Sequence, residues 1–376
     1  MAATQLSVID TVLERAVALG ASDVHLRCDA PVALRVAGNM VRLDTVVVEE
    51  DALLDLVEQL VGRGPFVEFL NRHEVDGSAQ AANALWRVHA YWCGGMPAVA
   101  LRRLQDSVPS MDELGVPEVV RTWAARRSGL LLVSGPTGAG KTTTLASVIR
   151  HITETRACHI VTIEDPIEYR YEPRMATVTQ RQVGRDTRNF ASALHAVVRE
   201  DPDVILIGEM RDPESMQAAL SIAEAGHLVL ATLHTSSALE VPSRIVDALP
   251  ASDQAQARVQ LAATLIGIVT QILLPRAGVS DQYDHLTPLR TRVAAFEVLA
   301  GTAGARALIR NGNYHQLASQ IQIDAEHGSM PMEESLARLV VQGTVEEEVA
   351  KAAALRPQEF QERLLRLRRT INLPSG

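Results

Sequence analysis

The sequence contains few aromatic residues, and this shortage argues against one class of partner. Phenylalanine, tyrosine and tryptophan together make up 3% of its 376 residues. Single-stranded nucleic acid is bound by basic stripes with interleaved aromatic side chains, and the sequence contains no such stripe. The formal net charge of −9 also argues against a protein that coats nucleic acid through bulk electrostatics. We therefore expect no nucleic-acid partner.

Cysteines and long apolar runs are scarce as well. The three cysteines, Cys28, Cys93 and Cys158, are odd in number, scattered and without a C-x-x-C pair. This pattern indicates a reducing compartment and excludes a zinc site evident from sequence. The most apolar long stretch, residues 261–274, is shorter than the roughly 18 residues that suggest a membrane span. We interpret it as part of a buried helix covering residues 253–274 in a soluble, cytosolic protein.

Lysine occurs only twice, and one of the two lies in a glycine-rich turn. Residues 129–134 form an apolar run, residues 135–142 read G-P-T-G-A-G-K-T, and a helical pattern follows. A buried strand, a glycine-rich turn and a helix are the context in which this signature predicts a phosphate-binding loop. The glycines let backbone N–H groups approach phosphates, and the helix N-terminus adds a partial positive charge.

The ligands of this loop follow from the same signature. Lys141 should reach the β- and γ-phosphates of ATP, and the Thr142 hydroxyl should bind Mg²⁺. The residues that we expect to bind ATP are Gly135, Pro136, Thr137, Gly138, Ala139, Gly140, Lys141, Thr142 and Thr143.

Carboxylates follow two further predicted strands. An apolar strand at residues 204–207 is followed by Glu209, and Glu164, Asp165 and Glu168 follow a strand at residues 159–163. Ligands bind at the carboxyl ends of strands in open parallel sheets, so Glu209 should face Mg²⁺ and the attacking water. Capping of the next turn by Glu209 is the alternative. Three clustered acids would repel one another without a metal; we favour Glu168 as the water-activating base, with Glu164 second.

Two histidines bracket a third predicted strand at residues 228–232. His234 follows its C-terminal end and is a candidate sensor of the γ-phosphate. His227 precedes the strand and could equally be a core histidine. The two histidines are seven positions apart across a strand, and we do not expect them to share a metal ion.

The chain divides into four regions. Residues 1–104 mix helical and strand-like patterns and predict a small α+β domain. Taken one at a time, its Arg87, Arg102 and Arg103 are most simply interpreted as solvated side chains at strand edges. Residues 105–117 contain prolines and glycine and predict a linker. Strands and helices alternate over residues 118–300, as in a parallel sheet with crossover helices. Residues 301–376 predict amphipathic helices.

Four of these stretches together carry a family resemblance. The phosphate loop, residues 162–168 with Asp165, residues 205–212 with Arg211, and residues 226–237 with His227 resemble the Walker A, Asp, Walker B and His boxes of the secretion ATPases. Order and spacing also match. Within that superfamily the chain is similar to the PilT-like pilus retraction branch from residue 21 to about residue 355. Residues 305–311 resemble that branch's A-I-R-N-L-I-R-E motif, with Asn311 in place of the final acid.

The resemblance implies an α/β fold, with a RecA-like P-loop ATPase domain preceded by a PAS-like α+β domain and followed by C-terminal helices. It implies a homohexamer that hydrolyses ATP with Mg²⁺ and powers type IV pilus retraction and twitching motility. Arg87, Arg102 or Arg103 would then act as arginine fingers. The protein would be cytoplasmic, held at the inner face of the cytoplasmic membrane by an inner-membrane pilus platform protein. Alternatives are a pilus assembly or type II secretion ATPase and, more distantly, a nucleic-acid translocase or a nucleotide-gated scaffold.

Overall fold

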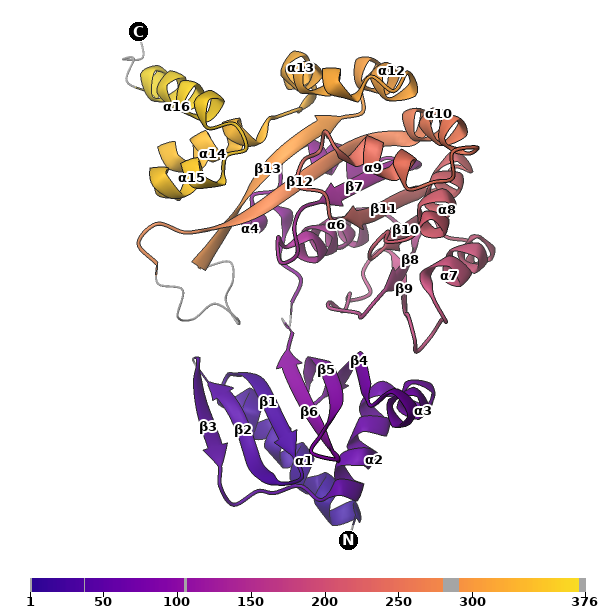
Figure 1. The fold of residues 1–376 in the computed structure, drawn as a ribbon, viewed down its shortest axis with the longest axis vertical. Coiled ribbons are helices and arrows are strands. Elements are labelled where there is room, and N and C mark those ends of the chain that lie inside the picture. The colour runs from indigo at the N-terminus through magenta and orange to yellow at the C-terminus, as the bar shows by residue number, and fades with distance from the viewer. Residues whose placement is uncertain (1, 37, 105–106, 280–290, 372–376) are drawn as a thin grey trace.

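The chain forms two separate β-sheets, each covered by helices (Figure 1). The computed structural model describes residues 2–36, 38–104, 107–279 and 291–371. Within these ranges, none of the helices combines the length with the apolar character that a membrane span requires. The α/β fold class expected from the sequence is confirmed.

The first sheet has six antiparallel strands in the order β3-β2-β1-β6-β5-β4. Its helices pack against the sheet around a core that includes Leu13, Leu53, Phe69 and Trp86. The elements are α1 (Ala2–Ala18), β1 (Ala21–Arg27), β2 (Ala30–Val36), β3 (Asn39–Leu43), α2 (Glu50–Val61), α3 (Arg63–Arg72), β4 (Glu74–Ala81), β5 (Ala84–Cys93) and β6 (Met96–Arg103). The α+β prediction is confirmed, although the sequence patterns had indicated neither α3 nor β4.

The second sheet has seven strands in the order β13-β12-β7-β11-β10-β8-β9, and every neighbouring pair is parallel except β12 and β13. Helices cover both faces, so β7, β10 and β11 are buried along their whole length. The elements are α4 (Met111–Leu114), α5 (Val119–Ala124), β7 (Gly129–Ser134), α6 (Lys141–Thr155), β8 (His159–Glu164), β9 (Thr177–Gln182), α7 (Phe190–Val197), a 3₁₀ turn (Val198–Glu200), β10 (Val204–Ile207), α8 (Pro213–Glu224), β11 (Leu228–Leu233), α9 (Val241–Asp247), α10 (Gln254–Thr264), β12 (Leu265–Pro275) and β13 (Arg292–Ala300).

The prediction of one buried helix over residues 253–274 is wrong, because α10 ends at Thr264 and β12 begins at Leu265. β12 pairs with β7 on one side and β13 on the other, so its backbone forms sheet hydrogen bonds on both sides. A strand buried on both faces is a continuous apolar run, and periodicity cannot distinguish it from a buried helix. Gly267 explains the close packing on this strand, because a Cβ there would lie 2.3 Å from the Trp123 ring.

The remaining helices pack around β12 and β13 at the C-terminal end of the chain (Figure 1). In α12, Arg306 donates hydrogen bonds from Nε and Nη2 to the Leu265 carbonyl at 3.1 and 2.7 Å, and Asn311 is the C-cap. The elements are α12 (Ala303–Arg310), a 3₁₀ turn (Tyr314–Gln316), α13 (Leu317–Ile323), a 3₁₀ turn (Asp324–His327), α14 (Met332–Val341), α15 (Glu347–Ala353) and α16 (Pro357–Ile371).

The two sheets meet at a buried contact between their edge strands. Ser78 on β4 donates a hydrogen bond from Oγ to Gln182 Oε1 on β9 at 2.7 Å, and both side chains are buried. Residues 105–106 of the expected linker and residues 372–376 of the expected helical region lie outside the described residues. The domain limits at residues 104, 117 and 300 stay predictions.

Candidate active site

The glycine-rich loop leaves the carboxyl end of β7, the strand between β11 and β12. Gly135 has a φ of 144°, and a Cβ there would lie 2.3 Å from the Gln271 carbonyl oxygen of β12. Gln271 also donates a hydrogen bond from Nε2 to the Ala139 carbonyl at 2.6 Å. The neighbouring strand therefore shapes the loop and requires a glycine at its start.

Lys141 is the first residue of α6 and is buried against the loop that precedes it. Its Nζ donates hydrogen bonds to the carbonyls of Gly135 at 2.8 Å and Pro136 at 3.1 Å. Burial lowers the pKa of its ammonium group, and the charge of Glu209 opposes this shift. The loop thus concentrates its positive charge at the N-terminus of α6, where anions bind.

Glu209 and His234 join the loop at the same edge of the sheet. Glu209 follows β10, and its Oε1 lies 2.6 Å from His234 Nε2 and accepts a hydrogen bond from Arg211 Nε at 2.7 Å. The other ring nitrogen of His234, Nδ1, lies 3.2 Å from Lys141 Nζ. Since a lysine ammonium can only donate, Nδ1 accepts and Nε2 carries the proton donated to Glu209. Burial raises the pKa of Glu209, but Arg211 and His234 outweigh it and leave that pKa lowered.

The three acids at the carboxyl end of β8, Glu164, Asp165 and Glu168, differ sharply in their surroundings. Glu164 is buried, and its Oε1 accepts hydrogen bonds from Thr162 Oγ1 at 2.6 Å and Gln180 Nε2 at 3.1 Å. Burial raises the pKa of Glu164 to about 7, against the effect of these hydrogen bonds. Burial also raises the pKa of Asp165, while Arg211 lowers it. Glu168 is partly exposed.

Arginines of the first sheet reach the same cavity. The cavity has a volume of about 670 Å³ and is lined by loop residues 137–143, by these three acids together with Glu209, by His234, and by Arg87 and Arg102. Arg87 Nη1 lies 3.8 Å from Glu168 Oε1. Arg102 donates a hydrogen bond from Nε to Asp23 Oδ1 at 2.8 Å. Arg103, the next residue on β6, is not among the lining residues, as expected where successive strand side chains point to opposite faces.

His227 lies apart from this site. It precedes β11, at the end of the strand away from His234, and its Nδ1 lies 2.8 Å from the Pro202 carbonyl. The structure therefore does not bring His227 to the cavity that His234 lines.

Some residues that line or shape the cavity were not predicted from the sequence, among them Gln271, Tyr169 and Arg292. Gln271 offered a signal, because it is a polar residue within an apolar run. Arg292 offered none, because only the antiparallel return of β13 brings it near the loop.

The residues at this edge also suit a bound magnesium ion. Thr142 and Glu209 both line the cavity and supply a hydroxyl and a carboxylate oxygen. Within the described ranges, no group of three or more His, Cys, Asp or Glu side chains could hold a metal by itself. Mg²⁺ commonly uses one or two protein oxygens and takes its other ligands from phosphates and water. The donor set therefore fits Mg²⁺ bound together with a nucleotide.

Comparison with known proteins identifies the family. Residues 2–351 match the family model described as "Type II/IV secretion system protein". The chain is 38% identical over 345 residues to the type IV pilus retraction ATPase PilT of Pseudomonas aeruginosa, covering 91% of this chain and 96% of that protein. It is 38% identical to a twitching motility protein of Neisseria gonorrhoeae, covering 85% of this chain and 83% of that protein.

A solved structure has the same fold along almost the whole chain. The crystal structure of the pilus retraction motor PilT with bound ADP matches with a TM-score of 0.83 and 39% identity. The match covers 94% of this chain and 99% of that one. The chain therefore belongs to the type II/IV secretion system protein family, and within it is similar to the PilT pilus retraction ATPases.

Proposed function

We propose that this chain hydrolyses ATP with Mg²⁺ and uses the energy to retract type IV pili. The observation that carries the proposal is one cavity in which the phosphate loop, Glu209, His234 and the acids at the carboxyl end of β8 meet arginines of the first sheet. Phosphoryl transfer needs these parts: a phosphate cradle, a metal site, an acid beside the water, and cations for the developing charge.

The phosphate loop would bind the triphosphate. Its backbone N–H groups and the Lys141 ammonium would hold the β- and γ-phosphates, with Lys141 exchanging its contacts to loop carbonyls for phosphate oxygens. Thr142 and Glu209 would hold Mg²⁺, which when bound screens the phosphate charge and orients the γ-phosphate. Because Glu209 is also paired with Arg211 and His234, its carboxylate is fixed in direction.

Glu168 is the proposed base for the attacking water. It lines the cavity and is partly exposed, so water can reach its carboxylate. Glu164 is the alternative, because a pKa of about 7 suits proton transfer near neutral pH. Its hydrogen bonds to Thr162 and Gln180, however, favour a supporting position behind Glu168.

His234 would report whether the γ-phosphate is present. It contacts both Lys141 and Glu209, the two groups that a bound triphosphate engages most directly. Movement of either group breaks or reshapes these contacts. Hydrolysis would therefore change the position of the loop that follows β11. This gives the site a mechanical output in addition to its chemistry.

Arg87 is the proposed arginine finger. It approaches the cavity from the first sheet and faces Glu168, whereas Arg102 is held by Asp23 and Arg103 lies outside the lining. Closure of the first sheet on the nucleotide would bring Arg87 to the phosphates, a rigid-body switch of a known kind. Six copies in a ring would let the closure of one subunit move its neighbour, and a pilus platform protein of the inner membrane would receive the work.

Deletion in the organism that encodes the chain tests the direction of work. If the chain is a retraction motor, the deletion strain should have more surface pili and no twitching motility. The intact gene should restore the pilus number and motility of the wild type. Lys141→Ala should fail to restore motility, whereas Lys351→Ala, which changes the other lysine, exposed on α15, should succeed. Fewer pili in the deletion strain would indicate an assembly motor and contradict the proposal.

A further inference from the structure

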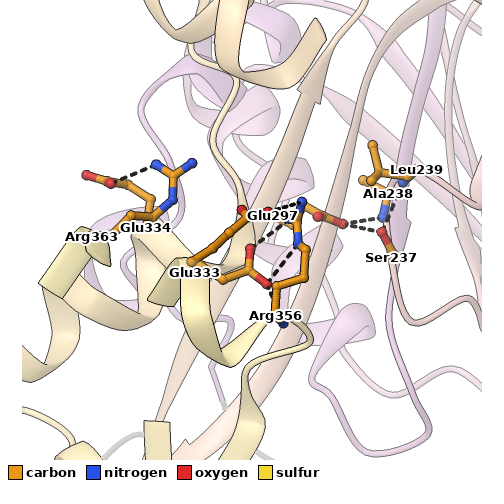
Figure 2. A network of polar contacts seen from close by, with 9 residues as sticks. Ser237, Ala238, Leu239, Glu297, Glu333, Glu334, Arg356 and Arg363 are labelled. Carbon is orange, nitrogen blue, oxygen red and sulfur yellow. Dashed lines mark hydrogen bonds and ion pairs between the residues drawn. The ribbon is translucent and has the colours of Figure 1, made fainter. Parts of the chain in front are cut away.

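A buried carboxylate on β13 holds the loop that carries His234. Glu297 is 1% exposed, and its Oε2 accepts hydrogen bonds from Ser237 Oγ at 2.7 Å and from the Ala238 backbone N–H at 2.6 Å (Figure 2). Ser237 Oγ in turn accepts a hydrogen bond from the Leu239 backbone N–H at 3.2 Å. One carboxylate oxygen thus fixes the loop between β11 and α9.

This loop is the one through which the nucleotide site would act. His234 lies three residues before Ser237 and contacts Glu209 at 2.6 Å and Lys141 at 3.2 Å. A shift of His234 therefore strains the hydrogen bonds that Ser237 and Ala238 donate to Glu297, because the chain between His234 and Ser237 is short. Small displacements of a catalytic group can lower the rate of reaction by about 100-fold.

The other side of Glu297 faces the C-terminal helices. Its Oε1 is buried and, within the part of the chain that the structure describes, has no hydrogen-bond partner. Glu333 on α14 is fully buried and pairs with Arg356, whose Nη2 lies 2.8 Å from Oε2. The Arg356 backbone N–H also donates to Glu333 Oε1 at 3.0 Å. Figure 2 shows Glu297 between the loop on one side and the Glu333–Arg356 pair on the other.

The charges of this pair act on Glu297 directly. Burial is the largest influence on the pKa of Glu297 and raises it; Glu333 raises it further, and Arg356 lowers it. The pKa of Glu297 therefore depends on the positions of Glu333 on α14 and of Arg356, the residue before α16. A buried carboxylate with one unpartnered oxygen costs stability, and such a group in a native structure calls for an explanation.

We propose that Glu297 is a positioning residue: it holds the His234 loop, residues 234–240, in the position that ATP turnover requires. Through the Glu333–Arg356 pair it also couples this loop to α14 and α16. The proposal rests on the proposed function, because it assigns Glu297 to the output of the same nucleotide site. Nucleotide turnover would then depend on the C-terminal helices, and the helices would respond to nucleotide.

Kinetics of the full chain test the positioning role. Glu297→Ala removes the acceptor and should lower kcat at least about tenfold, while affinity for ADP stays within about threefold. Glu297→Gln keeps a carbonyl oxygen for Ser237 and Ala238 and should restore kcat to within about threefold of wild type. Arg338→Gln is the matched control, since Arg338 pairs with Glu334 on the same helix, α14, and should leave both values unchanged.

Two outcomes of the kinetic test would overturn the proposal: an unchanged kcat in Glu297→Ala, or losses of kcat and ADP affinity in equal proportion. If Glu297→Ala does not fold, Ser237→Ala takes its place. It removes one of the two hydrogen bonds to Glu297, so a kcat lowered about threefold supports the role and an unchanged kcat contradicts it.

Hydrogen exchange with and without ADP tests the coupling. In wild type and in Arg338→Gln, ADP should slow exchange in residues 135–144 and also change exchange in α14 and α16. In Glu297→Gln the effect on residues 135–144 should persist, while the effect on the helices should fall at least about fivefold. Helices that respond equally in Glu297→Gln, or that never respond in wild type, would overturn the coupling. No ADP effect on residues 135–144 of wild type would instead refute the proposed nucleotide site.

Discussion

Burial of Glu164 predicts that the protein loses stability as pH rises toward neutrality. The pKa of this carboxyl is raised from 4.5 to about 7 in the folded chain, mainly by burial. Between these two values the folded protein keeps a proton that the unfolded chain has released. The free energy of unfolding must therefore fall as pH rises through this range, and the loss is complete above about pH 7.

The magnitude follows from the size of the shift. A change of about 2.5 pKa units, at about 1.4 kcal/mol per unit, corresponds to about 3 kcal/mol. Because Glu164 is 3% exposed, water does little to screen this effect. Glu164→Gln keeps a carbonyl oxygen for Thr162 and Gln180 but cannot ionise. The variant should match wild type near pH 5 to within about 1 kcal/mol and exceed its stability by about 3 kcal/mol at pH 8.

Urea unfolding of the nucleotide-free protein at pH 5, 6, 7 and 8 measures this difference directly. The stability of Glu164→Gln relative to wild type should grow steadily to about pH 7 and then level off. A difference that does not change with pH, or wild type that gains on the variant as pH rises, would refute the reasoning from burial.

Three further predictions concern the nucleotide site. Gly135→Ala should weaken ADP binding at least about 100-fold, because its Cβ would collide with the Gln271 carbonyl. Gly138→Ala should have a smaller effect in the same titration with fluorescent ADP, because nothing lies within 4 Å of its Cβ. Arg87→Gln should lower kcat at least about tenfold and Arg103→Gln less than twofold, and equal losses in steady-state assays would count against Arg87 as the finger. Chelation of Mg²⁺ should abolish phosphate release and its return should restore it, so hydrolysis that persists in excess chelator would exclude the metal.

The position of the site could be predicted from the sequence because its chemistry follows the ends of parallel strands. Glu209 and His234 closely follow buried apolar strands, and Lys141 follows one after the glycine-rich loop. The carboxyl ends of these strands, β7, β10 and β11, meet at one edge of the sheet. Local patterns were enough to bring these residues together. The assignment of roles to them stays a prediction until it is measured.

What the sequence did not predict depends on contacts between distant residues. Glu164 differs from Glu168 because it is buried at the end of β8 and accepts a hydrogen bond from Gln180 on the neighbouring strand β9, which no local pattern signals. Arg102 pairs with Asp23, 79 positions away in the chain, so its partner was not visible near it. The interpretation of residues 265–274 as helix failed because the pairing partners of β12, not its own pattern, decide its conformation.

Phosphate release by the purified protein, measured against its own concentration with mass by light scattering, tests the central claim most directly. The account predicts that specific activity rises as six-subunit rings form and is lost in both Lys141→Ala and Glu209→Gln. Lys351→Ala should behave as wild type, because this lysine is exposed on α15. Activity that is the same at every concentration in a monomer would contradict the ring, and no release despite bound nucleotide would contradict the motor itself.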